Sequence, residues 1–136
     1  MMNVRLVYYS LATRDMSLLD VQQILDVARP NNDSLHICGM LCYEQRYFLQ
    51  ALEGERADVN ELYLSIAEDA RHDEVVIISY QEIDEPMFNE WQMGFAPASD
   101  HFYSLLSELG QNSFDLSELT AEQALKLLQR LSESPE

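Results

Sequence analysis

Gln50 is a polar side chain at a position where the strand pattern predicts burial. Phe48 and Leu52 flank it at a spacing of two residues, so alternation along a strand puts all three side chains on one apolar face. A buried amide carries two donors and two acceptor sites, and leaving one of them unpaired costs about 1–3 kcal/mol. Gln50 therefore needs polar partners inside the core.

Tyr8 is the first candidate for such a partner. It continues the apolar face begun by Val4 and Leu6, in a strand expected beside that of Gln50. A buried phenol also needs a hydrogen-bond partner. Two interpretations fit the pattern: a structural hydrogen bond between Tyr8 and Gln50, or a polar ligand that engages the rest of the amide.

A ligand at this pair would need a slot, and two predicted helices could form its walls. Ile24 and Ile66 lie in the apolar stripes of these helices. Asn31 and Asn32, just past the first helix, could offer amides to a polar ring edge. Asparagines that follow a proline are more often turn formers, so both interpretations stay open.

Arg71 is a cation among acidic residues at the end of the second predicted helix. It could hold a phosphate, or it could form an ion pair with Asp69 or Asp73, worth at most about 1 kcal/mol if exposed. The four glycines are isolated from one another, so the sequence has no glycine-rich phosphate cradle. A nucleotide would have to bind without such a signature.

No catalytic constellation emerges from the sequence. No serine, cysteine or threonine has an evident base, and His36, His72 and His101 are scattered. Glu53 and Glu55 form a pair of carboxylates that the pattern places in a solvated turn. We therefore predict neither an enzyme nor a metal site.

The two cysteines predict a reducing compartment. Cys38 and Cys42 share a face of a predicted strand but stand roughly 13 Å apart, beyond the reach of a disulfide. We expect reduced core residues in a cytoplasmic protein. No signal peptide is recognisable, and no stretch approaches the roughly 18 apolar residues of a membrane span, so we expect no membrane contact.

The hydrophobic pattern predicts the order strand, helix, strand, strand, helix, strand. The expected strands cover residues 4–9, 35–43, 47–52 and 75–80, and the expected helices cover 17–30 and 57–69, with Pro30 ending the first. Right-handed crossovers turn this order into an α+β, ferredoxin-like βαββαβ core, an antiparallel or mixed sheet with two helices on one face. The strands of Tyr8 and Gln50 are central neighbours in it.

The segment 86–95 is expected to be extended. Trp91, Met93 and Phe95 alternate along it, which is typical of core packing. The alternative places Trp91 or Met93 beside the Tyr8–Gln50 pair.

Residues 98–136 are expected to form a separate helical extension after a first domain of residues 1–97. Apolar residues at helical spacing predict two helices, the second starting at a capping box of Thr120 and Gln123. We expect these helices to cover the open face of the sheet, whose apolar side chains would otherwise be exposed to water.

The chain is strongly acidic. Its 136 residues carry a formal net charge of −16, of which residues 51–100 hold −11 from thirteen acidic and two basic side chains. Such a domain repels phosphate backbones, so we do not expect it to bind nucleic acid. The acidic surface either aids solubility or docks a basic partner.

Six segments taken together resemble the BLUF family, the blue-light sensors that use FAD. They are RLVYYS at 5–10, NN at 31–32, HICGMLCY at 36–43, FLQALEG at 48–54, DARH at 69–72 and WQMGF at 91–95. The order and spacing of the segments make the resemblance specific over residues 3–96. One departure is Cys38, where the family usually has threonine.

The resemblance implies a noncovalent FAD between the two helices, with its ring system reaching Tyr8 and Gln50. It implies that Asn32 bonds the polar edge of the ring, with Asn31 nearby. The residues implied to pack the ring are Ile24, Phe48 and Ile66, and those implied near the ribityl-phosphate side are Asp69 and Arg71.

The resemblance also implies a mechanism and an output. Light drives electron and proton transfer from Tyr8, and a rearranged Gln50 gives a reversible red-shifted state that Trp91 or Met93 senses. The chain resembles a short, BLUF-only photoreceptor that signals to a separate protein and forms a homo-oligomer. The alternative function is a flavin-free regulatory or protein-interaction module on the same ferredoxin-like scaffold.

Overall fold

The computed structural model describes residues 2–44, 46–89, 93–97, 99–111 and 116–133. The predicted βαββαβ order is confirmed by β1 (Asn3–Ala12), α1 (Leu18–Ser34), β2 (Cys38–Glu44), β3 (Tyr47–Glu55), α2 (Arg56–Glu68) and β4 (His72–Ile83). After them come β5 (Gly94–Pro97), α3 (Asp100–Glu108), a 3₁₀ turn at Leu116–Glu118 and α4 (Ala121–Ser132). Trp91 lies outside the described residues.

The sheet is mixed and has the strand order β4-β1-β3-β2-β5. The pairs β4–β1, β1–β3 and β3–β2 are antiparallel, whereas β5 is parallel to β2. Of the segment expected to be extended at 86–95, the structure describes residues 86–89 and 93–95, and among these only Gly94 and Phe95 belong to a strand. The ferredoxin-like core is confirmed, with one short strand added at an edge.

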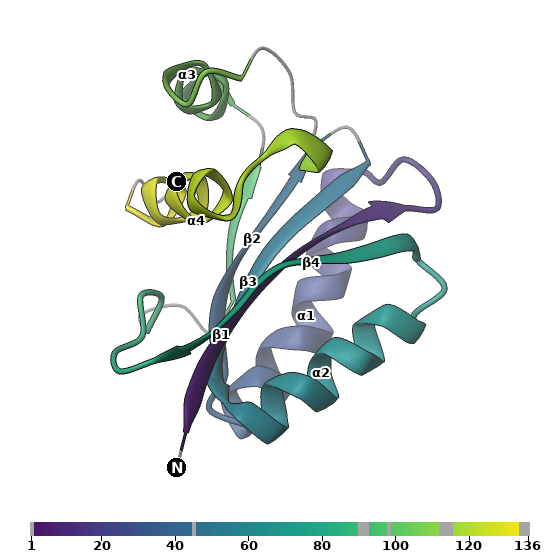
Figure 1. Ribbon diagram of the computed structural model, residues 1–136. Coiled ribbons are helices and arrows are strands. Elements are labelled where there is room, and N and C mark those ends of the chain that lie inside the picture. Colours follow the sequence, from purple (N-terminus) through teal and green to yellow (C-terminus); the bar gives the residue numbers. More distant parts are fainter. Residues whose placement is uncertain (1, 45, 90–92, 98, 112–115, 134–136) are drawn as a thin grey trace.

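The sheet lies between α1 and α2 on one side and the tail helices α3 and α4 on the other (Figure 1), with a core on each face. On one face, α1 and α2 cover a cluster of buried residues that includes Leu6, Tyr8, Leu25, Leu52 and Val59. On the other face, α3 and α4 cover a second cluster that includes Val7, Cys42, Leu49, Phe102 and Leu128. The two tail helices therefore occupy the face that the sequence left open, as predicted.

The prediction that Pro30 ends the first helix is wrong. A capping box starts α1, in which the Ser17 hydroxyl accepts from the Asp20 backbone N–H and the Asp20 carboxylate accepts from Ser17. The helix then continues through Pro30 to Ser34. Proline removes one backbone donor, but the following turn still closes, since the N–H of Leu35 bonds to the carbonyl of Asn31.

This extension moves two neighbouring features. Asn31 and Asn32 lie on the last turn of α1 instead of in a turn after it. The strand expected from residue 35 begins only at Cys38. By contrast, β4 is longer than predicted because it pairs with β1 along almost its whole length, from His72 to Ile83. Within the described residues, no helix is both long and apolar enough to cross a bilayer.

Candidate functional site

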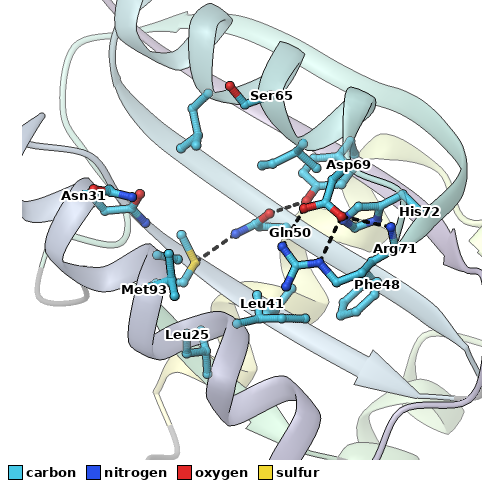
Figure 2. Close-up of a pocket in the computed structure, with 17 residues that line it drawn as sticks. Leu25, Asn31, Leu41, Phe48, Gln50, Ser65, Asp69, Arg71, His72 and Met93 are labelled. Atoms are coloured by element: carbon cyan, nitrogen blue, oxygen red, sulfur yellow. Dashed lines mark hydrogen bonds and ion pairs between the residues drawn. The ribbon is translucent and has the colours of Figure 1, made fainter.

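A cavity of about 280 Å³ opens between α1, α2 and the central strands (Figure 2). All nine residues that the resemblance implies for cofactor binding line it, and so does Met93. The other lining residues are Leu25, Val27, Ala28, Leu41, Leu62, Ser65 and His72. The fold thus gathers the predicted site residues around one space.

Tyr8 and Gln50 form the floor of the cavity. They are paired directly across β1 and β3, and both side chains are buried. The Tyr8 hydroxyl donates a hydrogen bond to Oε1 of Gln50. The sequence left open a structural hydrogen bond between Tyr8 and Gln50 or a polar ligand at the amide. The hydrogen bond is present, and it lies at the floor of a ligand-sized cavity.

The other end of the Gln50 amide is also occupied. Its Nε2 donates to the thioether sulfur of Met93 at 3.1 Å, as the dashed line in Figure 2 marks. Met93 is buried and directly precedes β5. The amide therefore joins an oxygen donor on β1 to a sulfur acceptor beside β5, and its two ends are chemically distinct.

Gly39 makes room for this arrangement. A Cβ atom at Gly39 would stand 2.0 Å from the carbonyl oxygen of Ala51 and 3.1 Å from the methyl carbon of Met93. Both distances are shorter than ordinary van der Waals contacts, so a larger residue would push the strand or the methionine away. The glycine at the second position of β2 is thus required by the close approach of Ala51 and Met93.

The environment of Tyr8 keeps its phenol protonated. Burial raises the pKa of Tyr8 well above its ordinary value, and the neighbouring Tyr63 raises it further. The two rings meet edge to face with centroids 5.8 Å apart. Tyr8 is therefore a neutral hydrogen-bond donor near neutral pH.

Apolar side chains form the long walls of the cavity. Ile24 and Ile66 approach from the two helices, and Phe48 lies on the sheet between them. Phe48 packs against Tyr43 and His72, with ring centroids 4.8 and 5.2 Å away. The result is a narrow apolar slot with polar groups at its floor and ends, the usual make-up of a small-molecule site.

Asp69 and Arg71 border the cavity where α2 ends. The Arg71 Nε donates to Oδ1 of Asp69 at 2.9 Å. Of the two acidic partners that the sequence offered, Asp69 and Asp73, Arg71 therefore pairs with Asp69. The hydrogen bond from Arg71 lowers the pKa of Asp69 to about 2. Half of the Arg71 side chain stays exposed, which leaves the guanidinium accessible to an anion.

His72 is a cavity residue that the residue-by-residue reasoning missed. Its Nδ1 is 2.6 Å from the Ser10 hydroxyl, and its ring packs on Phe48. Burial lowers the pKa of His72, so the neutral ring is favoured. The sequence signal that could have identified His72 is its position directly after Arg71, in the DARH segment.

The prediction that Glu53 is solvated is wrong. It is only 1% exposed, because β3 runs on to Glu55 and carries Glu53 into the sheet. Its carboxylate accepts from the Arg5 Nε at 2.7 Å and from the backbone N–H groups of Met87 and Phe88 at 2.9 and 2.8 Å. A buried carboxylate is tolerated when it is paired and fully hydrogen-bonded in this way.

The cysteines are free, as predicted: Cys42 is buried and Cys38 half-buried. Burial raises the pKa of the Cys38 thiol to about 12. Neither cysteine lines the cavity. In the part of the chain that the structure describes, no three His, Cys, Asp or Glu side chains lie together so that they could hold a metal ion.

A buried tyrosine and glutamine that face one apolar cavity are the arrangement that the resemblance to flavin-based photosensors implies. The chain belongs to the BLUF family. Its residues 3–94 match the family model described as sensors of blue-light using FAD.

The curated relatives are much longer proteins. Photoactivated adenylate cyclase subunit alpha of Euglena gracilis is 40% identical over 85 residues, which are 62% of this chain and 8% of that protein. Photoactivated adenylate cyclase subunit beta of Euglena longa is 40% identical over 89 residues, 65% of this chain and 10% of that protein. The chain thus spans about a tenth of the length of these relatives.

Solved structures match over nearly the whole chain. The photo-activated state of BlsA superposes with a TM-score of 0.91 at 32% identity, covering 99% of this chain and 98% of that one. The dark-state structure of BlrB, a BLUF protein, superposes with a TM-score of 0.80 at 27% identity, covering 96% and 94%. The tail helices are therefore part of the shared architecture.

Proposed function

We propose that the chain is a blue-light photoreceptor domain that binds FAD noncovalently, with the flavin ring in the cavity above Tyr8 and Gln50. The observation that carries this proposal is the hydrogen-bonded chain from Tyr8 through Gln50 to Met93 at the cavity floor. A cavity whose lining includes no cysteine also fits a cofactor held without a covalent link to a thiol.

The lining residues suit the parts of a flavin nucleotide. Ile24, Phe48 and Ile66 offer flat apolar contact to an aromatic ring, and Asn31 and Asn32 offer amide groups to its polar edge. Asp69 and Arg71 offer a hydroxyl acceptor and a phosphate partner at the cavity end, for the ribityl-phosphate side. The side chains present therefore fit the cofactor.

Tyr8 is the electron and proton donor in this proposal. When bound, the flavin supplies absorption of blue light and, once excited, an acceptor for one electron and one proton. The protonated Tyr8 phenol holds both, and its O–H already points at Oε1 of Gln50, so the proton has a route along an existing hydrogen bond. On return, Tyr8 regains its electron and its proton.

Gln50 is the switch. Turning the amide about its last bond exchanges Nε2 and Oε1, so the oxygen would face the Met93 sulfur. Neither atom can donate, and the contact between Gln50 and Met93 is lost. The new amide orientation gives the reversible red-shifted state, and Met93, which directly precedes β5, is the first group beyond Gln50 to respond.

The output leaves through the tail in this proposal, with residues 1–97 as sensor and 98–136 as output segment. α4 packs over β5 as well as over the central strands, so a displacement of β5 reaches it directly. We propose that the chain has no catalytic activity of its own, acts on a separate signalling protein and forms a homo-oligomer. The adenylate cyclase activity in the names of the relatives belongs to those longer proteins and is not part of this proposal.

The deciding experiment is an absorption spectrum of the purified protein, reconstituted with FAD, before and after blue light. We expect a yellow protein whose flavin bands shift reversibly to the red. A folded protein that stays colourless with FAD would instead establish the alternative, a flavin-free ferredoxin-like interaction module. A yellow protein whose spectrum ignores blue light would also contradict the proposal.

A further inference from the structure

Met93 is held at two points by two different elements. Its side-chain sulfur accepts from Nε2 of Gln50 on β3, and its main-chain carbonyl accepts from Nε of Arg29 on α1, both at 3.1 Å (Figure 2 shows the sulfur contact). Arg29 follows Ala28, which lines the cavity, on the helix that forms one wall. Met93 therefore bridges the switch residue and the wall helix.

The segment before Met93 is anchored at its other end. Glu53 accepts from the backbone N–H groups of Met87 and Phe88. Phe88 is fully buried in the core under the tail helices, whereas Met93 belongs to the core beneath α1 and α2. Phe88 and Met93 thus belong to different cores; Glu53 holds the backbone at Phe88, and Arg29 holds the backbone at Met93.

The two contacts of Met93 differ in strength. A thioether sulfur is a weak acceptor on a side chain with three rotatable bonds, so the Gln50 contact by itself places the sulfur poorly. A guanidinium that donates to a carbonyl is a charge-assisted hydrogen bond and is markedly stronger. The Arg29 contact, acting on the main chain, is therefore what keeps the sulfur within reach of the amide.

We propose that Arg29 is a positioning residue of the photochemical switch. By holding the Met93 carbonyl, it presents the sulfur to Gln50 and so accelerates the return of the amide to its dark orientation. This inference rests on the proposed function. If Met93 is in reach for only a fraction of the time, the rate of return falls to that fraction of its full value.

The test compares three full-length variants. Arg29→Leu removes the donor and keeps bulk, Arg29→Lys keeps a cation that can reach a carbonyl, and Arg56→Leu is a matched control. Arg56 is exposed and its guanidinium contacts the Met2 sulfur, away from the cavity. Two readouts are used: the methyl NMR signals of the six methionines in the dark, and the thermal recovery of the flavin spectrum after a blue-light pulse.

We expect Arg29→Leu to shift or split the Met93 methyl signal and to slow recovery about threefold to tenfold, the range of one net hydrogen bond. Arg29→Lys should restore most of both effects. Arg56→Leu should change neither the Met93 signal nor the recovery, and among the methionines its own contact is with Met2. An unchanged Met93 signal in Arg29→Leu would overturn the inference. So would normal recovery in that variant.

A double-mutant cycle excludes a merely structural role. In Met93→Ala the main-chain carbonyl remains but the sulfur is gone, so Arg29→Leu should have no further effect on recovery. Effects that multiply would show that Arg29 does not act through Met93. If the parent protein shows no light-induced shift at all, the proposed function fails, while the dark methyl signal still decides whether Arg29 positions Met93.

Discussion

Tyr8 donates its hydroxyl hydrogen bond to Oε1 of Gln50, and the two residues are partners across β1 and β3. Directly opposed residues of an antiparallel pair stand on the same face of the sheet, so this contact follows from strand register. The amide then uses its other end to donate to Met93. One side chain thereby couples a buried phenol on β1 to the residue that precedes β5.

Replacing Tyr8 by phenylalanine removes the hydroxyl and keeps the ring. We expect Tyr8→Phe to bind flavin but to lose the light-induced red shift, because the electron and proton donor is gone. Absorption spectra before and after illumination measure this. Tyr9→Phe, on the half-buried side chain facing the tail helices, is the control and should keep the shift. A normal shift in Tyr8→Phe would exclude the donor role.

Gln50→Leu replaces the amide by an apolar group of similar volume. We expect the variant to fold and to bind flavin, but to form no red-shifted state, since no amide remains to change orientation. The matched change Gln22→Leu lies on the exposed side of α1 and should leave the photocycle intact. Any long-lived light-state spectrum in Gln50→Leu would rule out the glutamine switch.

Arg71→Gln tests the phosphate side of the site. We expect the affinity for FAD to fall about threefold to tenfold, as for a half-exposed charge contact worth roughly 1 kcal/mol. Riboflavin has no phosphate and should bind equally well to both proteins. Titration of flavin-free protein, followed by fluorescence quenching, gives both constants. Arg14→Gln is the control, since Arg14 pairs with Asp20 away from the cavity; an equal loss for riboflavin would contradict the assignment.

Glu53→Gln removes the charge that balances the buried Arg5. We expect a loss of about 3–5 kcal/mol in the free energy of unfolding, because breaking one side of a buried ion pair leaves the other uncompensated. Urea unfolding measures the loss. Glu55→Gln, at the less buried end of the same strand, should cost under about 0.5 kcal/mol. Removing Arg5 as well, in Arg5→Met with Glu53→Gln, should recover part of the loss; no recovery would mean that the pairing is not the cause.

His72 should make stability depend on pH. Burial lowers its pKa from the ordinary 6.5, so the folded protein holds the ring neutral and the unfolded chain takes up a proton more readily. The contribution of His72 is therefore complete above pH 6.5 and is lost as the pH falls through the lower, folded-state pKa. We expect unfolding measured by urea between about pH 7.5 and 5.5 to show this loss in the parent protein and less of it in His72→Phe. The exposed His101→Phe should keep the full dependence.

Local pattern was sufficient for much of the fold. Alternation along the strands marked the Phe48–Leu52 face as buried and so singled out Gln50 as a polar residue on an apolar face. The apolar stripes that contain Ile24 and Ile66 predicted two helices over that face. The apolar residues of the tail predicted two further helices over the opposite face of the sheet. Such periodicities depend on residues a few positions apart, which is why they can be read from the sequence.

The contacts between distant segments could not be predicted from local periodicity. Glu53 looked solvated because the pattern placed it in a turn with Glu55, and only the register with Arg5 and the position of Met87 and Phe88 explain its burial. Pro30 looked like a helix stop because proline removes a donor, but α1 continues past it and its last turn is still hydrogen-bonded. For Glu53, contacts with distant segments overrode the local preference; for Pro30, the helix lost one donor and still closed its last turn.

The sequence by itself determined the family, the order of the elements and the chemistry of the Tyr8–Gln50 pair, because residue types and short spacings carry that information. Only the tertiary structure decided what the second end of the amide meets. It placed the Met93 sulfur 3.1 Å from Gln50 and the Met93 carbonyl against Arg29. These contacts join residues more than forty positions apart, and such geometry is set by strand register and helix packing, which no local pattern encodes.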